Sequence, residues 1–463
     1  MTSPTAPSTT YPPSRSAGAL DRDVLLTPDA PGWDRARRAW NLAVDQRPAA
    51  IGVPRGTDDV VALVRFAREH GLRVAPQATG HQAATLDSLH ESLLLKTALM
   101  RTVHVNAQDG TARAEAGAQW QDVVALAEGQ GLAPLAGSAP DVGVVGYTLG
   151  GGLSWLSRRF GLAVNSVLRA EVVTADGAAL TVDADTEPDL FWALRGGGGS
   201  YAIVTALEFE LRPVTAVYGG ALLWPMQRAA EVLVAWQLWL AQAPDEVTSV
   251  ARLLRIPELP DVAPALRGRQ MVAIEAAFIG DRGAGSNLIA PLRALGPELD
   301  TFAMMTPTQL GGLHMDPPNP VPVFGDGMLL SELPIAAIDN LLDVAGAYSR
   351  SPLLCVDLRH LGGAIARERA DGGAVSGLSA EFGVFAVGMA PDPQVREIVA
   401  DHVDGVQDAL RTWDAGRSFA NLAERRRGGD ELFGERTHAR LRAVKRAYDP
   451  ADVIHANHPV KPA

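Results

Sequence analysis

A histidine follows a short loop of small residues at the end of a strand-like run. The loop covers residues 76–80, and His81 comes directly after Gly80. Small residues and a glycine allow backbone N–H groups to approach an anion closely. A single loop histidine is more often a structural hydrogen-bonding residue than a reactive one. This pattern alone is therefore only a weak indication of a site.

Two further segments are rich in glycine. Residues 137–162 contain Gly143, Gly146 and three consecutive glycines at 150–152, and a run of four covers 196–199. Consecutive glycines are costly inside a helix or strand, but they suit a backbone that passes against a flat or charged group. Tight packing of two turns is the alternative explanation. Neither segment has the spacing of a Rossmann fingerprint or a P-loop.

Predicted strands and helices alternate around these segments. Residues 50–53, 57–71 and 72–75 are predicted to form a strand, a helix and a strand, because the apolar residues of 57–71 recur at helical spacing. The segment 137–162 is predicted to be one long loop. Further strands are predicted at 93–95, 103–105, 111–116, 167–174, 179–182 and 201–211, and further helices at 120–131 and 188–194.

The sequence changes character after Pro213. From about 216 to 415, strand-like runs alternate with helix-like runs, which is typical of an α+β unit whose sheet is covered by helices. Residues 1–20 are dominated by Pro, Ser and Thr and are predicted to be a disordered tail. We therefore expect a unit at 21–213, a second at 214–415 and a C-terminal segment at 416–463.

Composition excludes several classes of function. The 463 residues carry 41 Lys and Arg against 53 Asp and Glu, a net charge of -12, which argues against a nucleic-acid binder. The one cysteine, Cys355, excludes an internal disulfide framework and multi-cysteine metal sites, and no metal is predicted. We recognise neither a secretory signal nor a membrane-spanning run, so a cytoplasmic protein is expected. Its oligomeric state stays open.

The ordered motifs resemble those of the FAD-linked oxidases with a PCMH-type FAD-binding domain, the vanillyl-alcohol oxidase and berberine-bridge-enzyme superfamily. The resemblance covers residues 50–213 and 415–460. It implies an α+β fold with a two-part PCMH-type FAD-binding domain, at 21–213 and 416–463, and a substrate domain with an antiparallel sheet covered by helices. The motifs are Gly80-His81, the glycine pattern of 140–152, Phe191 to Gly199, Ile203 to Thr205, Tyr448-Asp449-Pro450 and Asn457.

The resemblance also implies FAD, covalently bonded through His81 to the 8α-methyl group of the flavin. Residues around 75–80 match the pyrophosphate loop, and the glycines from 143 to 152 match a second flavin-binding stretch. The residues implied to contact the cofactor are Ala75, Gln77, Ala78, Thr79, Gly80, His81, Gln82, Ser138, Asp141, Val142, Gly143, Gly146, Tyr147, Gly150, Gly151, Gly152, Ile203 and Asn457.

Two positions depart from the family pattern. Members with two covalent flavin bonds have cysteine where this chain has Ala139, so attachment through His81 alone is expected, as in single-histidyl members such as 6-hydroxy-D-nicotine oxidase. Many members have a tyrosine near the reacting centre where this chain has Phe419, which cannot accept a proton. We expect Phe419 to shape the substrate pocket, with a place in the ordinary core as the alternative.

A proton acceptor must then come from elsewhere or be unnecessary. Tyr147, His314 and His360 are the ionisable candidates, although a structural role is the commoner one for each. A neutral amine can lose hydride without a strong base, whereas an alcohol usually needs its proton removed. Phe419 therefore favours amine chemistry or an unidentified base. The arginines at 158–159 and 425–427 are predicted to be solvated.

The predicted function is that of an FAD-dependent oxidoreductase, an oxidase that takes hydride from a C–H bond next to O or N of a small molecule. Molecular oxygen is the expected acceptor, and secondary metabolism is one expected setting. One alternative is a flavin-holding cyclase or isomerase without net oxidation. Another is a flavin-free binding protein on the same scaffold, which a colourless purified protein would indicate.

Overall fold

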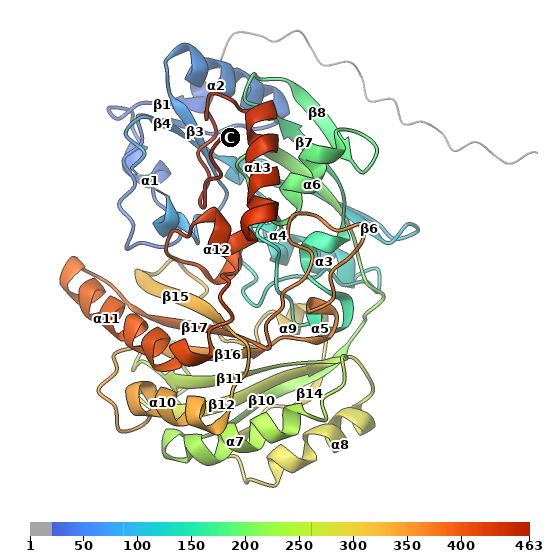
Figure 1. The fold of residues 1–463 in the computed structure, drawn as a ribbon, viewed down its shortest axis with the longest axis vertical. Coiled ribbons are helices and arrows are strands. Elements are labelled where there is room, and N and C mark those ends of the chain that lie inside the picture. The colour runs from blue at the N-terminus through green and yellow to red at the C-terminus, as the bar shows by residue number, and fades with distance from the viewer. Residues whose placement is uncertain (1–20, 87, 261) are drawn as a thin grey trace, which may run out of the picture.

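Three β-sheets organise the chain, each with its own helices (Figure 1). The computed structural model describes residues 21–86, 88–260 and 262–463. The tail predicted at 1–20 lies outside the described residues. Within these ranges, no helix is both long and apolar enough to cross a membrane.

The first sheet has four strands in the order β1-β2-β4-β3, with β2, β4 and β3 parallel. Helix α2, Thr57–Glu69, connects β2 to β3 and buries Val60, Leu63 and Val64. This is the predicted strand, helix and strand, and it delivers the end of β3 to the loop that carries His81. The strands are β1 Leu25–Leu26, β2 Ala50–Gly52, β3 Arg73–Gln77 and β4 Ser92–Lys96, and a short helix α1 covers Trp33–Ala36.

The second sheet has five antiparallel strands in the order β5-β6-β9-β7-β8. Helices α3, α4 and α6 contribute buried apolar residues to the core of this unit. The bounds are β5 Val103–Asn106, β6 Thr111–Glu115, α3 Trp120–Glu128, α4 Val144–Leu149, α5 Ser157–Phe160, β7 Val167–Val173, β8 Ala179–Asp183, α6 Pro188–Gly197 and β9 Ile203–Glu210.

The third sheet has eight strands, all paired antiparallel, and helices α7, α8, α10 and α11 cover one of its faces (Figure 1). The opposite face is turned toward the first two sheets. This confirms the predicted α+β class. The bounds are β10 Val217–Pro225, α7 Ala229–Leu240, β11 Val247–Arg255, β12 Gln270–Phe278, α8 Arg282–Arg293, β13 Leu299–Asp300, β14 Ala303–Met305, α9 Pro307–Leu310, β15 Val323–Leu330, α10 Ile335–Ala345, β16 Cys355–His360, β17 Phe382–Met389 and α11 Pro393–Leu410.

The C-terminal segment returns to the first two sheets, where α13 lies beside α6 (Figure 1). It contains α12, Gly429–Phe433, and α13, Glu435–Tyr448. The fully buried Lys445 lies 2.5 Å from Asp449 and donates to the carbonyl of Ser200 at 2.8 Å. Asp449 also accepts the backbone N–H of Ile454, which anchors the last residues to β3.

Two expectations, one about a loop and one about exposed arginines, are wrong. The stretch 137–162 is not one loop, because it contains α4 and α5. Arg158 and Arg427, expected in solvent, have side chains only 5% and 15% exposed. Arg158 is buried because its guanidinium donates to the carbonyls of Val247 and Leu361. Arg427 is held by the buried carboxylate of Asp326 at 2.5 Å.

The ion pair of Lys445 makes a stability prediction. Lys445→Met is expected to lower the free energy of unfolding by about 3–5 kcal/mol, because the substitution leaves a buried carboxylate without its cation. Urea unfolding followed by tryptophan fluorescence measures the change. Lys461→Met is the matched control: Lys461 is exposed, its partner Asp452 keeps Lys445 and Arg73 as counter-charges, and the loss should be less than about 1 kcal/mol. Equal losses in the free energy of unfolding of the two variants would contradict the view that the buried ion pair of Lys445 is the one that stabilises the fold.

Candidate active site

Two adjoining cavities lie where the three sheets meet. The first has a volume of about 310 Å³ and the second about 140 Å³. A ligand pocket in proteins typically has roughly 300–1,000 Å³, so the first cavity alone reaches that range. The walls that both cavities share are Pro76, Gln77, Ala78, Gln82, Gly146 and Asn457.

The first cavity has two unlike walls. One wall comes from the loop after β3 and from residues 137–147, which carry the predicted cofactor contacts. The other comes from the inner face of the eight-stranded sheet, through Arg359 and Phe385, and from residues 421–424. The cavity is therefore built by segments far apart in the sequence.

Most of the predicted cofactor residues line these cavities. His81 and Tyr147 lie on the first cavity, and Gly150 lies on the second. The full set is Gln77, Ala78, Thr79, Gly80, His81, Gln82, Ser138, Val142, Gly143, Gly146, Tyr147, Gly150 and Asn457. Five others, Ala75, Asp141, Gly151, Gly152 and Ile203, line neither cavity.

Two neighbours fix the imidazole of His81. The indole of Trp40 stacks on it with ring centroids 4.2 Å apart, and the hydroxyl of Thr79 lies 2.7 Å from Nδ1. Nε2 has no hydrogen-bond partner among the described residues and lies 3.6 Å from an oxygen of Asp141. Burial would raise the pKa of Asp141, but His81 and the Trp40 indole, which donates to it at 2.6 Å, hold that pKa below its ordinary value. Asp141 is therefore a carboxylate that lies near His81.

The glycines have two different roles. A Cβ on Gly146 would meet no atom within 4 Å, so that position faces open space in both cavities. Gly151 and Gly152 have positive φ, and a Cβ there would lie 2.6 Å from the ring of Phe419 or 2.5 Å from that of Tyr147. These two are glycine because the backbone packs tightly, not because they face a ligand.

Ala75 and Ile203 lie in strands with fully buried side chains. Ala75 belongs to β3 and Ile203 to β9. Each therefore supports the cavity walls from within the core.

Of the predicted catalytic groups, only Tyr147 lines the first cavity. Its hydroxyl donates to the carbonyl of Leu135 at 3.2 Å. Burial raises the pKa of Tyr147 well above its ordinary value. The phenol therefore stays protonated, and it is a hydrogen-bonding group rather than a base.

The two histidines belong to buried networks on the eight-stranded sheet. His314 is hydrogen-bonded through Nδ1 to the carboxylate of Glu275 and lines neither cavity. His360 lies 3.2 Å from the guanidinium of Arg158. Burial and the charge of Arg158 lower the pKa of His360 to about 3, so its ring is neutral. Both have structural partners, which was the commoner expectation.

Phe419 lies in the core rather than on either cavity. It is 3% exposed and packs with Leu162, Leu329 and Leu361. The substrate-facing position expected for it is therefore not what the structure shows. Asn421, two residues on, does line the first cavity, and its amide bonds the carbonyl of Tyr147 and the N–H of Gly152.

Sequence reasoning missed two ionisable residues of the first cavity, Arg359 and Glu424. Arg359 is 18% exposed and donates to Asp357 at 3.0 Å. Burial, with the negative charge of Asp326 in addition, raises the pKa of Glu424 to about 8. Strand alternation could have placed Arg359 on one face of its sheet. No local pattern marks Glu424, because its position depends on long-range packing.

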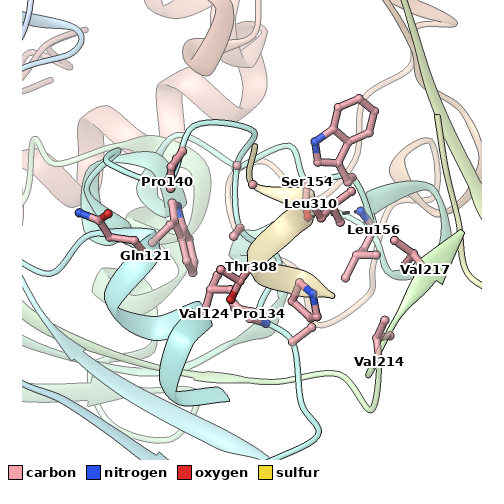
Figure 2. A pocket seen from close by; sticks show the side chains of 17 residues that line it. Gln121, Val124, Pro134, Pro140, Ser154, Leu156, Val214, Val217, Thr308 and Leu310 are labelled. Atoms are coloured by element: carbon pink, nitrogen blue, oxygen red, sulfur yellow. Dashed lines mark hydrogen bonds between the residues drawn. The ribbon is translucent and has the colours of Figure 1, made fainter. Parts of the chain in front are cut away.

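The site fits a flavin dinucleotide. Its walls offer two adjoining, partly apolar cavities, a helix position where a Cβ would enter the open space, and a histidine nitrogen without a partner among the described residues. A separate pocket of about 70 Å³ lies where α3 meets α9, lined by Gln121, Val124, Thr308 and Leu310 (Figure 2). That pocket is too small for a flavin and contains no ionisable candidate.

Comparison with known proteins agrees with this geometry. A family model for an FAD binding domain matches residues 48–183. The uncharacterized FAD-linked oxidoreductase YgaK of Bacillus subtilis is 28% identical over 95% of this chain and 96% of its own length. The (R)-6-hydroxynicotine oxidase of Paenarthrobacter nicotinovorans is 33% identical over 40% of this chain and 41% of its own length.

A solved structure shows the same fold over nearly the whole chain. The BBE-like 1 protein of Physcomitrella patens superposes with a TM-score of 0.82 and 21% identity, over 95% of this chain and 97% of that protein. The chain is therefore an FAD-dependent oxidoreductase that carries an FAD-binding domain at residues 48–183 and has the fold of this BBE-like protein.

Proposed function

We propose that this oxidoreductase takes hydride from a C–H bond next to nitrogen or oxygen in a small molecule, with FAD linked covalently at His81 alone and molecular oxygen as the final acceptor. The first cavity carries the proposal. It has His81 on one wall and ionisable groups of a different part of the chain on the other. A substrate held between the two walls would lie between the cofactor side and the eight-stranded sheet.

Bound FAD would supply the hydride acceptor, and the chain supplies position, shape and proton transfer. The groups that would hold the cofactor are the loop at 76–82, Gly146 and Asn457. Gly146 and Asn457 line both cavities, and every residue of the loop lines the first cavity. Trp40 and Thr79 keep the ring of His81 in one orientation. Ala139 lies on the same cavity and has no thiol, which supports a single attachment.

Glu424 is the proposed proton acceptor. An alcohol or a protonated amine must lose a proton from O or N as the adjacent C–H bond breaks. A carboxyl with a pKa of about 8 suits this task, because it is a stronger base than an ordinary carboxylate. This fills the role left vacant by Phe419 and makes both alcohols and amines eligible.

Anaerobic mixing with a panel of alcohols, sugars and cyclic amines tests the function. The expected result is bleaching of the flavin absorbance by at least one compound, followed by hydrogen peroxide when oxygen is admitted. A product formed without bleaching would instead favour the cyclase or isomerase alternative. A colourless wild-type protein after expression with ample FAD would contradict the proposal.

Acid precipitation tests the attachment. Flavin should stay with the precipitated wild-type protein, and mass analysis of tryptic peptides should place it on the peptide that contains His81. His81→Ala should release its flavin into the supernatant yet remain folded, because many other groups contact the cofactor. His104→Ala is the matched control, since His104 lies on β5 away from both cavities. Flavin found on any other residue would overturn the assignment.

Gly146 separates cofactor binding from folding. Gly146→Val should fold but retain much less FAD, because its side chain would enter open cavity space. Gly151→Val should instead lower the melting temperature, since it forces a branched side chain into positive φ and against Phe419. Absorbance of FAD per protein and thermal unfolding are the two measurements. Full flavin content in soluble Gly146→Val would contradict the cavity assignment.

The ionisation of Glu424 should appear in the pH profile. Only the deprotonated carboxylate accepts a proton, so the rate of flavin bleaching should rise as pH increases through about 8. Glu424→Gln should lose this ionisation and slow bleaching by about 10²- to 10⁴-fold. Glu246→Gln, at a surface ion pair with Arg159, is the matched control. An unchanged profile in Glu424→Gln with full FAD content would exclude Glu424 as the acceptor.

A further inference from the structure

Arg359 projects into the first cavity from the inner face of the eight-stranded sheet. On β16, Val356 and Leu358 pack in the core beneath the helices, while Cys355 packs on the opposite side. Because strand side chains alternate between faces, Asp357 and Arg359 share the side of Cys355. Arg359 accordingly lines the first cavity opposite the loop that carries His81.

A chain of buried charges fixes the orientation of Arg359. Nη2 of Arg359 donates to one oxygen of Asp357 at 3.0 Å, and Nε of Arg252 donates to the other at 2.8 Å. Arg252 is paired in turn with Glu275 at 3.1 Å. Asp357 and Arg252 are both buried, so this network has little freedom to rearrange. It holds the guanidinium of Arg359 in place before any ligand arrives.

The hydrogen-bonding capacity of Arg359 is not fully used. Its Nε is buried and has no hydrogen-bond partner in the part of the chain that the structure describes. A buried donor without a partner is unusual in a folded protein and needs an explanation, which a bound ligand would supply. Among the described residues that line the first cavity, Arg359 is the only arginine or lysine. An anion that enters the cavity would find its cationic partner there.

The surroundings of Arg359 indicate the rest of the ligand. Phe385 lies on the neighbouring strand β17, opposite Asp357 in the register, and lines the same cavity. Leu153 and Leu422 add apolar surface. A cavity lined by one guanidinium, a phenylalanine ring and two leucines suits a ligand with an apolar body and one planar anionic group. Arginine binds a carboxylate through paired, parallel hydrogen bonds.

We propose that Arg359 recognises a carboxylate on the substrate, so that the oxidised compound is a small carboxylic acid with an aromatic or aliphatic body. The inference rests on the proposed function for the identity of the reaction, because it names the substrate class of the same cavity. Arg359 is then a specificity-determining residue, and Asp357 is the positioning residue that aims it.

Calorimetric titration of the purified holoenzyme tests the proposal without turnover. The probes are benzoate, phenylacetate and 3-phenylpropionate, each compared with its neutral amide. Wild-type protein should bind at least one acid about tenfold or more tightly than the matching amide. Arg359→Gln should weaken binding of that acid by about 10- to 100-fold and leave the amide unchanged. Arg359→Lys should bind the acid with an affinity between those of the wild type and Arg359→Gln, because lysine keeps the positive charge but cannot form two parallel hydrogen bonds to a carboxylate.

Two controls make the outcomes decisive. Arg269→Gln removes an arginine of a surface pair with Glu298 and should leave acid binding unchanged. FAD content and circular dichroism are recorded for each variant, and Arg359→Lys carries the comparison if Arg359→Gln does not fold. The proposal is overturned if no acid binds more tightly than its amide, or if the Arg359 variants keep wild-type preference. Loss of FAD from the variants would also overturn it, because Arg359 would then serve the cofactor.

The failure of the two proposals can be told apart. If the flavin-loaded wild-type protein oxidises neutral compounds but does not bind the acids, only the inference about Arg359 is wrong. If the protein holds no flavin but still binds the acids more tightly than the amides, and this preference depends on Arg359, the proposed function is wrong and the anion site stands.

Discussion

Charge burial on the inner face of the eight-stranded sheet is the constraint on which the site depends. Arg252 binds Asp357, Glu275 and the carbonyl of His314, so each buried charge has an opposite neighbour. A buried ion whose partner is removed is costly, because neither water nor a counter-charge remains to stabilise it. Removing any one of these charged side chains would therefore leave another buried charge without its partner. The intact geometry of the network places the cavity-facing groups of β16 opposite the loop of His81.

The opposite wall is built on small residues rather than on charge. Gly143 lies against Ala78, and Gly150 lies against the amide of Asn421, so the α4 region approaches its neighbours closely. Asn421 then bonds the backbone before the glycine run, at Tyr147, and at the end of the run, at Gly152. Because these contacts join the C-terminal segment to residues 137–152, the wall is complete only when the two distant segments have folded together.

Sequence patterns predicted the parts of the site that local chemistry determines. Helix α2 follows from apolar spacing. The loop ending at His81 and the glycines at 143–150 were assigned to the cofactor by the resemblance to a known family, because their local patterns alone left tight packing open, and most of them line the cavities. Arg359 could not be predicted, because the alternation of a strand indicates on which face of the sheet a side chain lies but not which segments pack against that face. Glu424 could not be predicted because its position depends on long-range packing. Arg158 was predicted in solvent from its charge alone, whereas carbonyl groups of distant segments accept its hydrogen bonds in the core.

The pKa of Glu424 shows how the site and the fold are coupled. Burial and the charge of Asp326 raise this pKa from its ordinary value of 4.5 to about 8. The folded state therefore binds the proton more tightly than the unfolded chain does. The resulting stabilisation is fully present below about pH 4.5 and is lost as pH rises through about 8. Replacing Asp326 would lower the pKa of Glu424 but would also disrupt the segment. Asp326 accepts the backbone N–H groups of Glu424 and Arg425 and binds the side chain of Arg427. The same carboxylate that fixes the segment therefore makes Glu424 a stronger base, and this base is acquired at the expense of stability at alkaline pH.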